Sequence, residues 1–264
     1  MINIQHISLT FNPNTPMATQ ALRDLSLHIP EGQFVTIIGS NGAGKSTLLN
    51  VLSGDYKIDQ GQIFVDDSDI TKWPTEKRAR FIGRIFQDPL KGSCENLTIE
   101  ENLSLALSRG KARSLFPALT KNNREHFYKL IESLGLGLEH RMKDEMGLLS
   151  GGQRQALALL MATLSPMKLL LLDEHIAALD PKMADYILEL TKKFVDKYKL
   201  TTLMVTHSMS HALKYGDRLL MMNEGKVIYD AEGEKKSKLT IQNLLDKFSK
   251  IRDGQMLNDR MILS

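Results

Sequence analysis

Cysteine is nearly absent from this sequence, because Cys94 is the only one among 264 residues. A single cysteine excludes an intrachain disulfide and a zinc site built from several thiolates. Long apolar runs are missing as well. The two longest, 156–164 and 169–172, fall far short of the about 20 residues that a membrane-spanning helix needs. Residues 1–6 lack the basic region and apolar segment of a secretory signal. We therefore expect a cytoplasmic protein.

The sequence also lacks an excess of charge of either sign. Its 34 Lys and Arg residues nearly balance its 31 Asp and Glu residues, which leaves a net charge of +3. This small charge does not favour binding to nucleic acid, and we expect no nucleic-acid partner. The 42% hydrophobic and 25% charged residues are typical of a globular protein, and the length suits one large α/β domain or a core domain with a smaller insert.

Residues 39–47 form the most informative stretch of the chain. Their sequence, GSNGAGKST, matches G-x-x-x-x-G-K-[ST] and lies between an apolar run at 34–38 and a helical pattern at 46–52. Glycines let successive N–H groups point at a polyphosphate, and the following helix adds its positive N-terminal end. Lys45 is expected to reach the β and γ phosphates, and Ser46 to place a hydroxyl on Mg²⁺. A glycine turn that holds a lysine by chance is the competing interpretation. The strand, loop and helix context favours nucleotide binding.

All nine residues of this loop are predicted to contact the nucleotide. They are Gly39, Ser40, Asn41, Gly42, Ala43, Gly44, Lys45, Ser46 and Thr47.

Two carboxylates follow a run of four leucines at 169–172. Such a run suits a strand covered on both faces, and acids at its carboxyl end lie where ligands bind in open α/β sheets. Asp173 is predicted to hold Mg²⁺, and Glu174 to polarise the attacking water. Apolar strands that end in acids are common, so this prediction depends on the phosphate loop.

From residue 169 onwards the predicted strands are separated by predicted helices, and this alternation after a phosphate loop argues for a parallel-rich sheet. Between 98 and 164 the strand signals give way to helical spacing, which indicates a helical insert. An amphipathic helix is predicted over 240–251. Strands are predicted at 2–11, 22–29, 34–38, 61–66, 82–86, 169–172, 201–205, 218–222 and 227–229, and helices at 181–198 and 208–215.

A third motif, SGGQRQ, opens the helical run at 156–164. Ser150 suits a helix N-cap, and a glycine-flanked helix start is also an anion site, so both interpretations hold together. With this motif, residues 2–231 resemble the ABC-type ATPases, the nucleotide-binding subunits of ABC transporters. Residues 149–153 match the family's signature. The resemblance implies an α/β fold with a P-loop NTPase core, an antiparallel β part and an inserted helical subdomain. It divides the chain into 1–87 with 166–235 (core), 88–165 (helical subdomain) and 236–264 (C-terminal helical extension).

By the same resemblance, Ser150, Gly151, Gly152 and Gln153 contact ATP held by a second copy. Gln87 matches the family's Q-loop, where the side chain touches Mg²⁺ or the attacking water.

The resemblance assigns three more residues. Asp180 matches the D-loop, which lies across the dimer interface. His207, after the strand at 201–205, matches the switch histidine that contacts the γ-phosphate, although an isolated histidine at a strand end is more often structural. Phe11 matches the aromatic that stacks on adenine, with core packing as the alternative.

The function implied is that of an ATPase whose catalytic residues are Glu174, His207, Gln87 and Lys45. It would act as a homodimer with ATP and Mg²⁺, on the inner face of the membrane, with a separate permease and an external solute-binding protein. Segments 11–16, 86–90 and 172–175 resemble a bacterial branch of amino-acid or tryptophan/tyrosine import ATPases. A soluble ABC ATPase that assembles a protein complex, of the iron–sulfur assembly type, is the alternative. A small-molecule kinase would leave the signature without a purpose.

Overall fold

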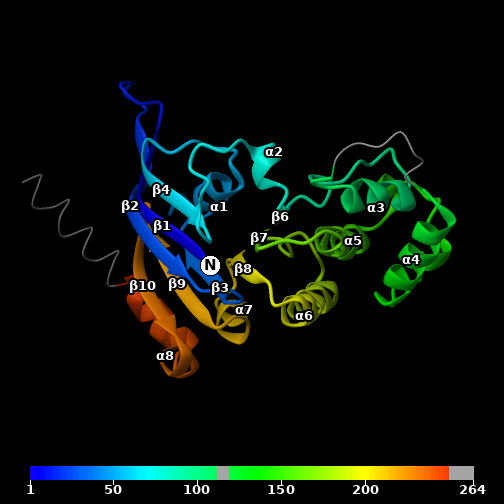
Figure 1. Cartoon of the computed structure of the whole chain (residues 1–264). Coiled ribbons are helices and arrows are strands. Elements are labelled where there is room, and N and C mark those ends of the chain that lie inside the picture. Colours follow the sequence, from blue (N-terminus) through cyan, green and yellow to red (C-terminus); the bar gives the residue numbers. More distant parts are fainter. Residues whose placement is uncertain (112–118, 250–264) are drawn as a thin grey trace, which may run out of the picture.

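The computed structural model describes residues 1–111 and 119–249, which build two β-sheets and a group of helices (Figure 1). One sheet has four antiparallel strands in the order β2-β1-β4-β5. The other has six strands in the order β10-β9-β3-β8-β7-β6, and only its β10–β9 pair is antiparallel. The predicted parallel-rich sheet and antiparallel part are therefore both present.

The strands are β1 (Ile2–Phe11), β2 (Thr19–Ile29), β3 (Phe34–Gly39), β4 (Gln60–Val65), β5 (Ser68–Asp69), β6 (Ile82–Ile85), β7 (Leu169–Asp173), β8 (Thr201–Val205), β9 (Arg218–Asn223) and β10 (Lys226–Glu232). The helices are α1 (Lys45–Ser53), α2 (Thr75–Arg78), α3 (Ile99–Leu107), α4 (Lys121–Glu132), α5 (Gly151–Thr163), α6 (Pro181–Tyr198), α7 (Met209–Lys214) and α8 (Gly233–Ser237), with 3-10 turns η1 (Leu138–His140) and η2 (Met146–Leu148) and a last helix over 241–249.

All nine strands predicted from the sequence are found, and so are the helices at 181–198 and 208–215 to within a residue. The short elements β5, α2 and α8 were missed because two to five residues carry too little periodicity to be recognised. The helix predicted over 240–251 is present as 241–249, and its last two residues lie outside the described part of the chain.

The four leucines of β7 show how the core is divided. Leu169 and Leu171 pack with α1 and the antiparallel sheet, whereas Leu170 and Leu172 pack with α3, α5 and α6. All four are fully buried, because neighbouring residues of a strand point to opposite faces and here both faces are covered. The helices α1 and α5 therefore lie on opposite faces of the six-stranded sheet.

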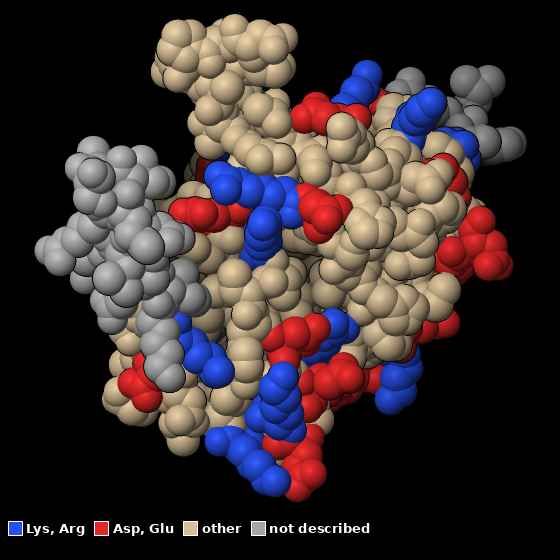
Figure 2. All heavy atoms as spheres, turned by 90° about the vertical axis from the view of Figure 1, so that its left-hand side faces the viewer, with Lys and Arg blue, Asp and Glu red and all other residues tan. Residues whose placement is uncertain are grey.

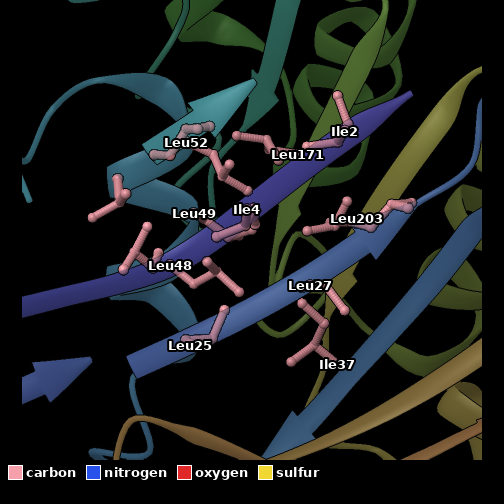
Figure 3. Packing of buried hydrophobic residues seen from close by; sticks show 14 of the residues in the cluster. Ile2, Ile4, Leu25, Leu27, Ile37, Leu48, Leu49, Leu52, Leu171 and Leu203 are labelled. Atoms are coloured by element: carbon pink, nitrogen blue, oxygen red, sulfur yellow. The ribbon is translucent and has the colours of Figure 1, made fainter. Parts of the chain in front are cut away.

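The first of these two cores lies between the antiparallel sheet and the six-stranded sheet, with α1 enclosed (Figure 3). Ile4 of β1 and Leu25 of β2 point towards Leu48 and Leu49 of α1 in this view. This packing holds α1 in position at the end of β3.

In the described residues between β6 and β7, the regular elements are helices, joined by turns and loops, and one isolated bridge links Thr98 to Glu145. Both α3 and α5 begin with a capping box, in which Thr98 and Ser150 exchange hydrogen bonds with the residue three positions on. The predicted division into 1–87 with 166–235, 88–165 and 236–264 stays a prediction, and residues 250–264 are not among those described.

The C-terminal elements pack on α7. Leu244, in the helix over 241–249, is fully buried against Ala212 of α7 and Ile38 of β3. Lys236 of α8 is also buried, and its Nζ donates to the carbonyl of Gly216 at 2.5 Å. The segment therefore covers the helix that follows β8.

Basic and acidic side chains are interspersed on the face of the molecule shown in Figure 2. The ion pairs of the structure include Arg218 and Asp230, whose Nη2 and Oδ2 atoms are 2.5 Å apart. Among the described residues, no helix is long and apolar enough to span a bilayer.

Candidate active site

The phosphate loop connects β3 to α1 and leaves the start of that helix open. The N-cap residue is Gly44, which has φ 93° and, as a glycine, no side chain to cap the helix. In contrast, α3, α4, α5, α6 and α7 each begin with a side-chain cap. The first N–H groups of α1 are thus free of side-chain caps and suit phosphate oxygens.

Close packing requires glycine at two positions of the loop. A Cβ atom at Gly44 would lie 2.5 Å from the carbonyl oxygen of Ala21, and one at Gly39 would lie 2.4 Å from that of Met222. These contacts are with backbone atoms, which cannot turn away as a side chain can. The two glycines therefore let β2 and β9 approach the loop.

Lys45 points into its own loop. Its Nζ donates to the carbonyl oxygens of Gly39 and Ser40, both at 2.9 Å. Burial lowers the pKa of Lys45, while the nearby carboxylates of Glu174 and Asp173 act to raise it. This position suits a cation that exchanges two carbonyl contacts for phosphate oxygens.

Asp173 and Ser46 meet across the loop, since the Ser46 hydroxyl donates to Asp173 Oδ1 at 3.0 Å. Carboxylate and hydroxyl oxygens are ligands that Mg²⁺ accepts, and it takes the rest from phosphate and water. Within residues 1–111 and 119–249, no group of three or more His, Cys, Asp and Glu side chains is arranged to hold a metal. The pair fits a magnesium ion that arrives with a nucleotide.

Glu174 and His207 lie at the carboxyl ends of the adjacent strands β7 and β8. Glu174 Oε1 is 2.6 Å from His207 Nε2, and the Glu174 N–H donates to the Val205 carbonyl at 3.1 Å. Glu174 has φ 49°, a left-handed backbone conformation that is uncommon for a non-glycine residue. The turn after β7 thus directs the Glu174 side chain towards β8.

Gln87 is exposed and follows β6 by two residues. The backbone beside it is held by Gln155 of α5, whose Nε2 donates to the carbonyls of Phe86 at 3.1 Å and His175 at 2.6 Å. Gln155 therefore ties the segment after β6 to the segment after β7. No role was predicted for Gln155, because one glutamine in a helix shows nothing of its partners.

The signature residues form the start of α5. Ser150 accepts from the Gln153 N–H at 3.3 Å, and Gln153 Oε1 accepts from the Ser150 N–H at 3.1 Å, so the predicted cap is present. Gly152 is packed so tightly that a Cβ atom there would lie 2.2 Å from Met183 Cγ, whereas one at Gly151 would find Leu179 at 3.5 Å. Ser150 itself is exposed.

Phe11 and Asp180 have their described contacts elsewhere. Phe11, partly buried against the core, meets the ring of Tyr56 edge to face, with centroids 5.2 Å apart. Asp180 caps α6 by accepting from the Met183 N–H at 3.0 Å. The sequence did not indicate Tyr56, which lies in a turn with no motif of its own.

Comparison with known proteins agrees with this geometry. The family model described as "ABC transporter" matches residues 22–177, which include the phosphate loop, the signature and both carboxylates. This chain belongs to the ABC transporter family.

Its relatives are transport ATP-binding proteins. A tyrosine transport ATP-binding protein of Clostridioides difficile (strain R20291) is 46% identical over 94% of this chain and 98% of its own length. The energy-coupling factor transporter ATP-binding protein EcfA2 of Caldanaerobacter subterraneus subsp. tengcongensis is 34% identical over 86% of this chain and 77% of its own length. The predicted resemblance to amino-acid import ATPases is confirmed by the first of these.

A solved structure shows the same fold. The ATP-binding cassette MJ0796, determined as a dimer in a post-hydrolysis state with ADP and phosphate, superimposes with a TM-score of 0.75 at 28% identity, covering 88% of this chain and 98% of that one. The present chain is thus the ATP-binding subunit of an ABC transporter, an ATPase whose reaction is coupled to transport.

The ABC ATPase fold therefore brings five predicted residues together at one edge of the six-stranded sheet: Lys45, Ser46, Asp173, Glu174 and His207. The roles of the individual residues, including Gln87, Asp180 and Phe11, stay predictions.

Proposed function

We propose that two copies of this ABC ATPase bind two MgATP molecules in a head-to-tail dimer and so drive a separate membrane permease. Each site combines the phosphate loop of one copy with Ser150, Gly151 and Gly152 of the other. Closure of the dimer accompanies ATP binding, and hydrolysis releases it.

One feature of the fold carries this proposal. The helices α1 and α5 lie on opposite faces of the six-stranded sheet, because they pack against alternate leucines of β7. Gln155, near the start of α5, contacts the segments that follow β6 and β7, so both helices begin at the carboxyl edge of the sheet. A triphosphate on one phosphate loop is thus more readily met by the signature of a facing copy than by that of its own chain.

The chemistry proposed is in-line attack by water on the γ-phosphate. Glu174 orients or deprotonates the water, and His207 contacts the γ-phosphate. Lys45 stabilises the charge that develops on the phosphoryl oxygens. Ser46 and Asp173, with Gln87, would hold Mg²⁺, which would supply positive charge to neutralise the phosphate oxygens.

Two inactive variants test the shared site. Lys45→Ala removes the phosphate ligand of its own loop, and Gly151→Asp sets a carboxylate against the phosphate that the facing copy holds. The space at Gly151 accepts a side chain, and an acid in the first turn of a helix does not destabilise it. Each variant alone should lose ATPase activity.

A 1:1 mixture of the two variants should recover on the order of a quarter of the wild-type rate, because half of the dimers are mixed and each holds one intact site. Gly151→Ala is the matched control for the added side chain without its charge. If each chain completed its own site, the mixture would stay inactive.

The permease is proposed to dock in a groove of about 480 Å³ between the end of β6, α3 and α5. Its wall includes the exposed Leu105 and the single cysteine, Cys94. Leu105→Asp should abolish copurification with an integral membrane protein, whereas Ile241→Asp, an exposed apolar residue outside the groove, should not. Recovery of soluble partners alone by the wild type would favour the assembly-factor alternative.

An amino acid such as tyrosine is the proposed cargo, with an external solute-binding protein as the third component. The relative named for tyrosine transport supports this, since it is 46% identical and nearly equal in length. In lipid vesicles that hold the ATPase with its copurified permease, tyrosine presented with the binding protein should stimulate ATP hydrolysis. Stimulation by a chemically unrelated solute instead would assign a different cargo.

A further inference from the structure

Arg84 of β6 joins the phosphate-loop helix to the carboxylate Asp173. Its Nη1 donates to Asn50 Oδ1 at 2.6 Å and to Asp55 Oδ2 at 2.7 Å, and its Nη2 donates to Asp173 Oδ2 at 2.9 Å. The Arg84 and Asp173 side chains are 11% and 13% exposed, so this pair is largely shielded from solvent. Charged hydrogen bonds of this kind fix direction as well as distance.

The two oxygens of Asp173 are held by different partners. Arg84 takes Oδ2, and the Ser46 hydroxyl takes Oδ1. Because a carboxylate is planar, fixing Oδ2 also fixes where Oδ1 points. Oδ1 is the oxygen that faces Ser46, the second predicted magnesium ligand.

We propose that Arg84 is a positioning residue that sets the affinity of the site for Mg²⁺ by holding Asp173 in its metal-binding orientation. This inference rests on the magnesium site of the proposed function. Partners of metal ligands that orient them in this way typically change metal affinity 10- to 100-fold when they are removed.

Arg84 suits this role because it is anchored without Asp173. Asn50, Ser53 and Asp55 all accept from its Nη1, and the guanidinium carbon lies 4.6 Å from the centre of the Phe86 ring. Because the guanidinium is rigid and planar, contacts that hold Nη1 also keep Nη2 in place when Asp173 changes its other partner. A mobile arginine that merely filled the metal site would lack this second anchor.

A competing role predicts the opposite sign. If Arg84 acted as a cation that Mg²⁺ must displace, its removal would strengthen Mg²⁺-dependent binding. If Arg84 positions Asp173, its removal should weaken Mg²⁺-dependent binding.

The experiment measures equilibrium binding of a fluorescent ATP analogue with saturating Mg²⁺ and again with EDTA. In the Arg84→Gln variant, the gain in affinity that Mg²⁺ provides should fall by about 10- to 100-fold, while affinity in EDTA stays close to wild type. Arg84→Lys keeps the positive charge but loses the two parallel N–H donors of the guanidinium, so its Mg²⁺-dependent gain should lie between those of the wild type and Arg84→Gln. An unchanged or enlarged gain in Arg84→Gln would overturn the proposal.

Arg109 supplies the matched control. It lines the same groove as Arg84 and is partly buried, but its Nη2 donates to the carbonyl of Ala162 at 2.9 Å, away from the carboxylates. Arg109→Gln should leave the Mg²⁺-dependent gain at the wild-type value. An equal loss in both variants would mean that Arg84 acts through general packing, against the proposal.

A double-mutant cycle then tests whether Arg84 acts through Asp173. In an Asp173→Asn background, Arg84→Gln should cause no further loss of the Mg²⁺-dependent gain, and additive losses would contradict the proposed route. Binding is measured on each chain separately, so this result is independent of the mixing experiment. A wild type without any Mg²⁺-dependent gain would refute the magnesium site and the role of Arg84 together.

Discussion

Glu174 Oε1 and His207 Nε2 lie 2.6 Å apart at the ends of neighbouring parallel strands. Glu174 is largely enclosed, with a side chain 14% exposed, whereas His207 is 49% exposed. The two side chains therefore meet within one chain, with the histidine on the open side.

His207→Ala should lower kcat for ATP hydrolysis by on the order of 100-fold, because it removes both the partner of Glu174 and the proposed donor to the γ-phosphate. Binding of a fluorescent ATP analogue should change far less. Steady-state ATPase assays and binding titrations make the comparison, and the exposed His6, which pairs with Asp24, gives the control variant His6→Ala. Full activity in His207→Ala would contradict its assigned role.

Gly152→Ala should destabilise the fold, whereas Gly151→Ala should be tolerated. The added Cβ would lie 2.2 Å from Met183 Cγ at the first position and 3.5 Å from Leu179 at the second. Overpacking of this kind costs about 1–3 kcal/mol of unfolding free energy. Urea unfolding of both variants measures the difference.

Truncating Met183, the side chain that the new Cβ would clash with, should restore the stability of Gly152→Ala. A double variant with Met183→Ala removes Cγ and the atoms beyond it. If the double variant were as unstable as the sum of the two single changes, the contact with Met183 would not be the cause.

His175 should make the protein sensitive to acid. Burial, with a smaller contribution from His211, lowers the pKa of His175 from 6.5 to about 3. Between pH 6.5 and about 3, His175 is protonated in the unfolded chain but neutral in the folded chain. The free energy of unfolding therefore falls as the pH drops below 6.5, by on the order of 1.4 kcal/mol per pH unit. Above that pH the contribution of His175 to stability does not change with pH.

The tautomer of His175 follows from its neighbour. The Thr191 hydroxyl donates its hydrogen to the Ile187 carbonyl at 2.7 Å, so its oxygen can only accept from His175 Nε2, which lies 3.3 Å away. The neutral His175 ring therefore carries its hydrogen on Nε2.

The variant His175→Gln tests the predicted acid sensitivity. Glutamine cannot titrate, so this variant should lose less stability than the wild type between pH 7 and 4.5 in thermal unfolding. The exposed His140→Gln should behave as the wild type.

Phe11→Ala should weaken binding of ATP about 10-fold and leave binding of inorganic tripolyphosphate unchanged. Stacking on an aromatic ring contributes about 1–3 kcal/mol per base, and tripolyphosphate has no base to stack. Competition against a fluorescent ATP analogue measures both ligands. Equal weakening of the two would indicate that Phe11 acts through the core and its edge contact with Tyr56.

Much of the site could be predicted because its parts are local in sequence. A strand, a glycine loop and a helix start make the phosphate site within nine residues, and Ser150 and Gln153 cap one helix three positions apart. Such contacts form between neighbours in the chain, so a short pattern specifies them.

Contacts between distant segments were not predictable in this way. Arg84 and Asp173 are 89 positions apart, and Gln155 and Phe86 are 69 apart. An arginine on an edge strand and a glutamine in a helix are common in any sequence. Their roles appear only when the sheet sets β6 beside β7 and α5 across their ends.

The sequence by itself determined the phosphate loop, the signature motif, the acidic strand end and the order of the longer strands and helices, since each depends on backbone geometry and periodicity over a few residues. Only the tertiary structure decided that α1 and α5 occupy opposite faces of one sheet, and that Arg84 grips Asp173 while Glu174 meets His207. The reason is that packing and charge pairing act across space, between side chains whose separation along the chain leaves no trace in local pattern.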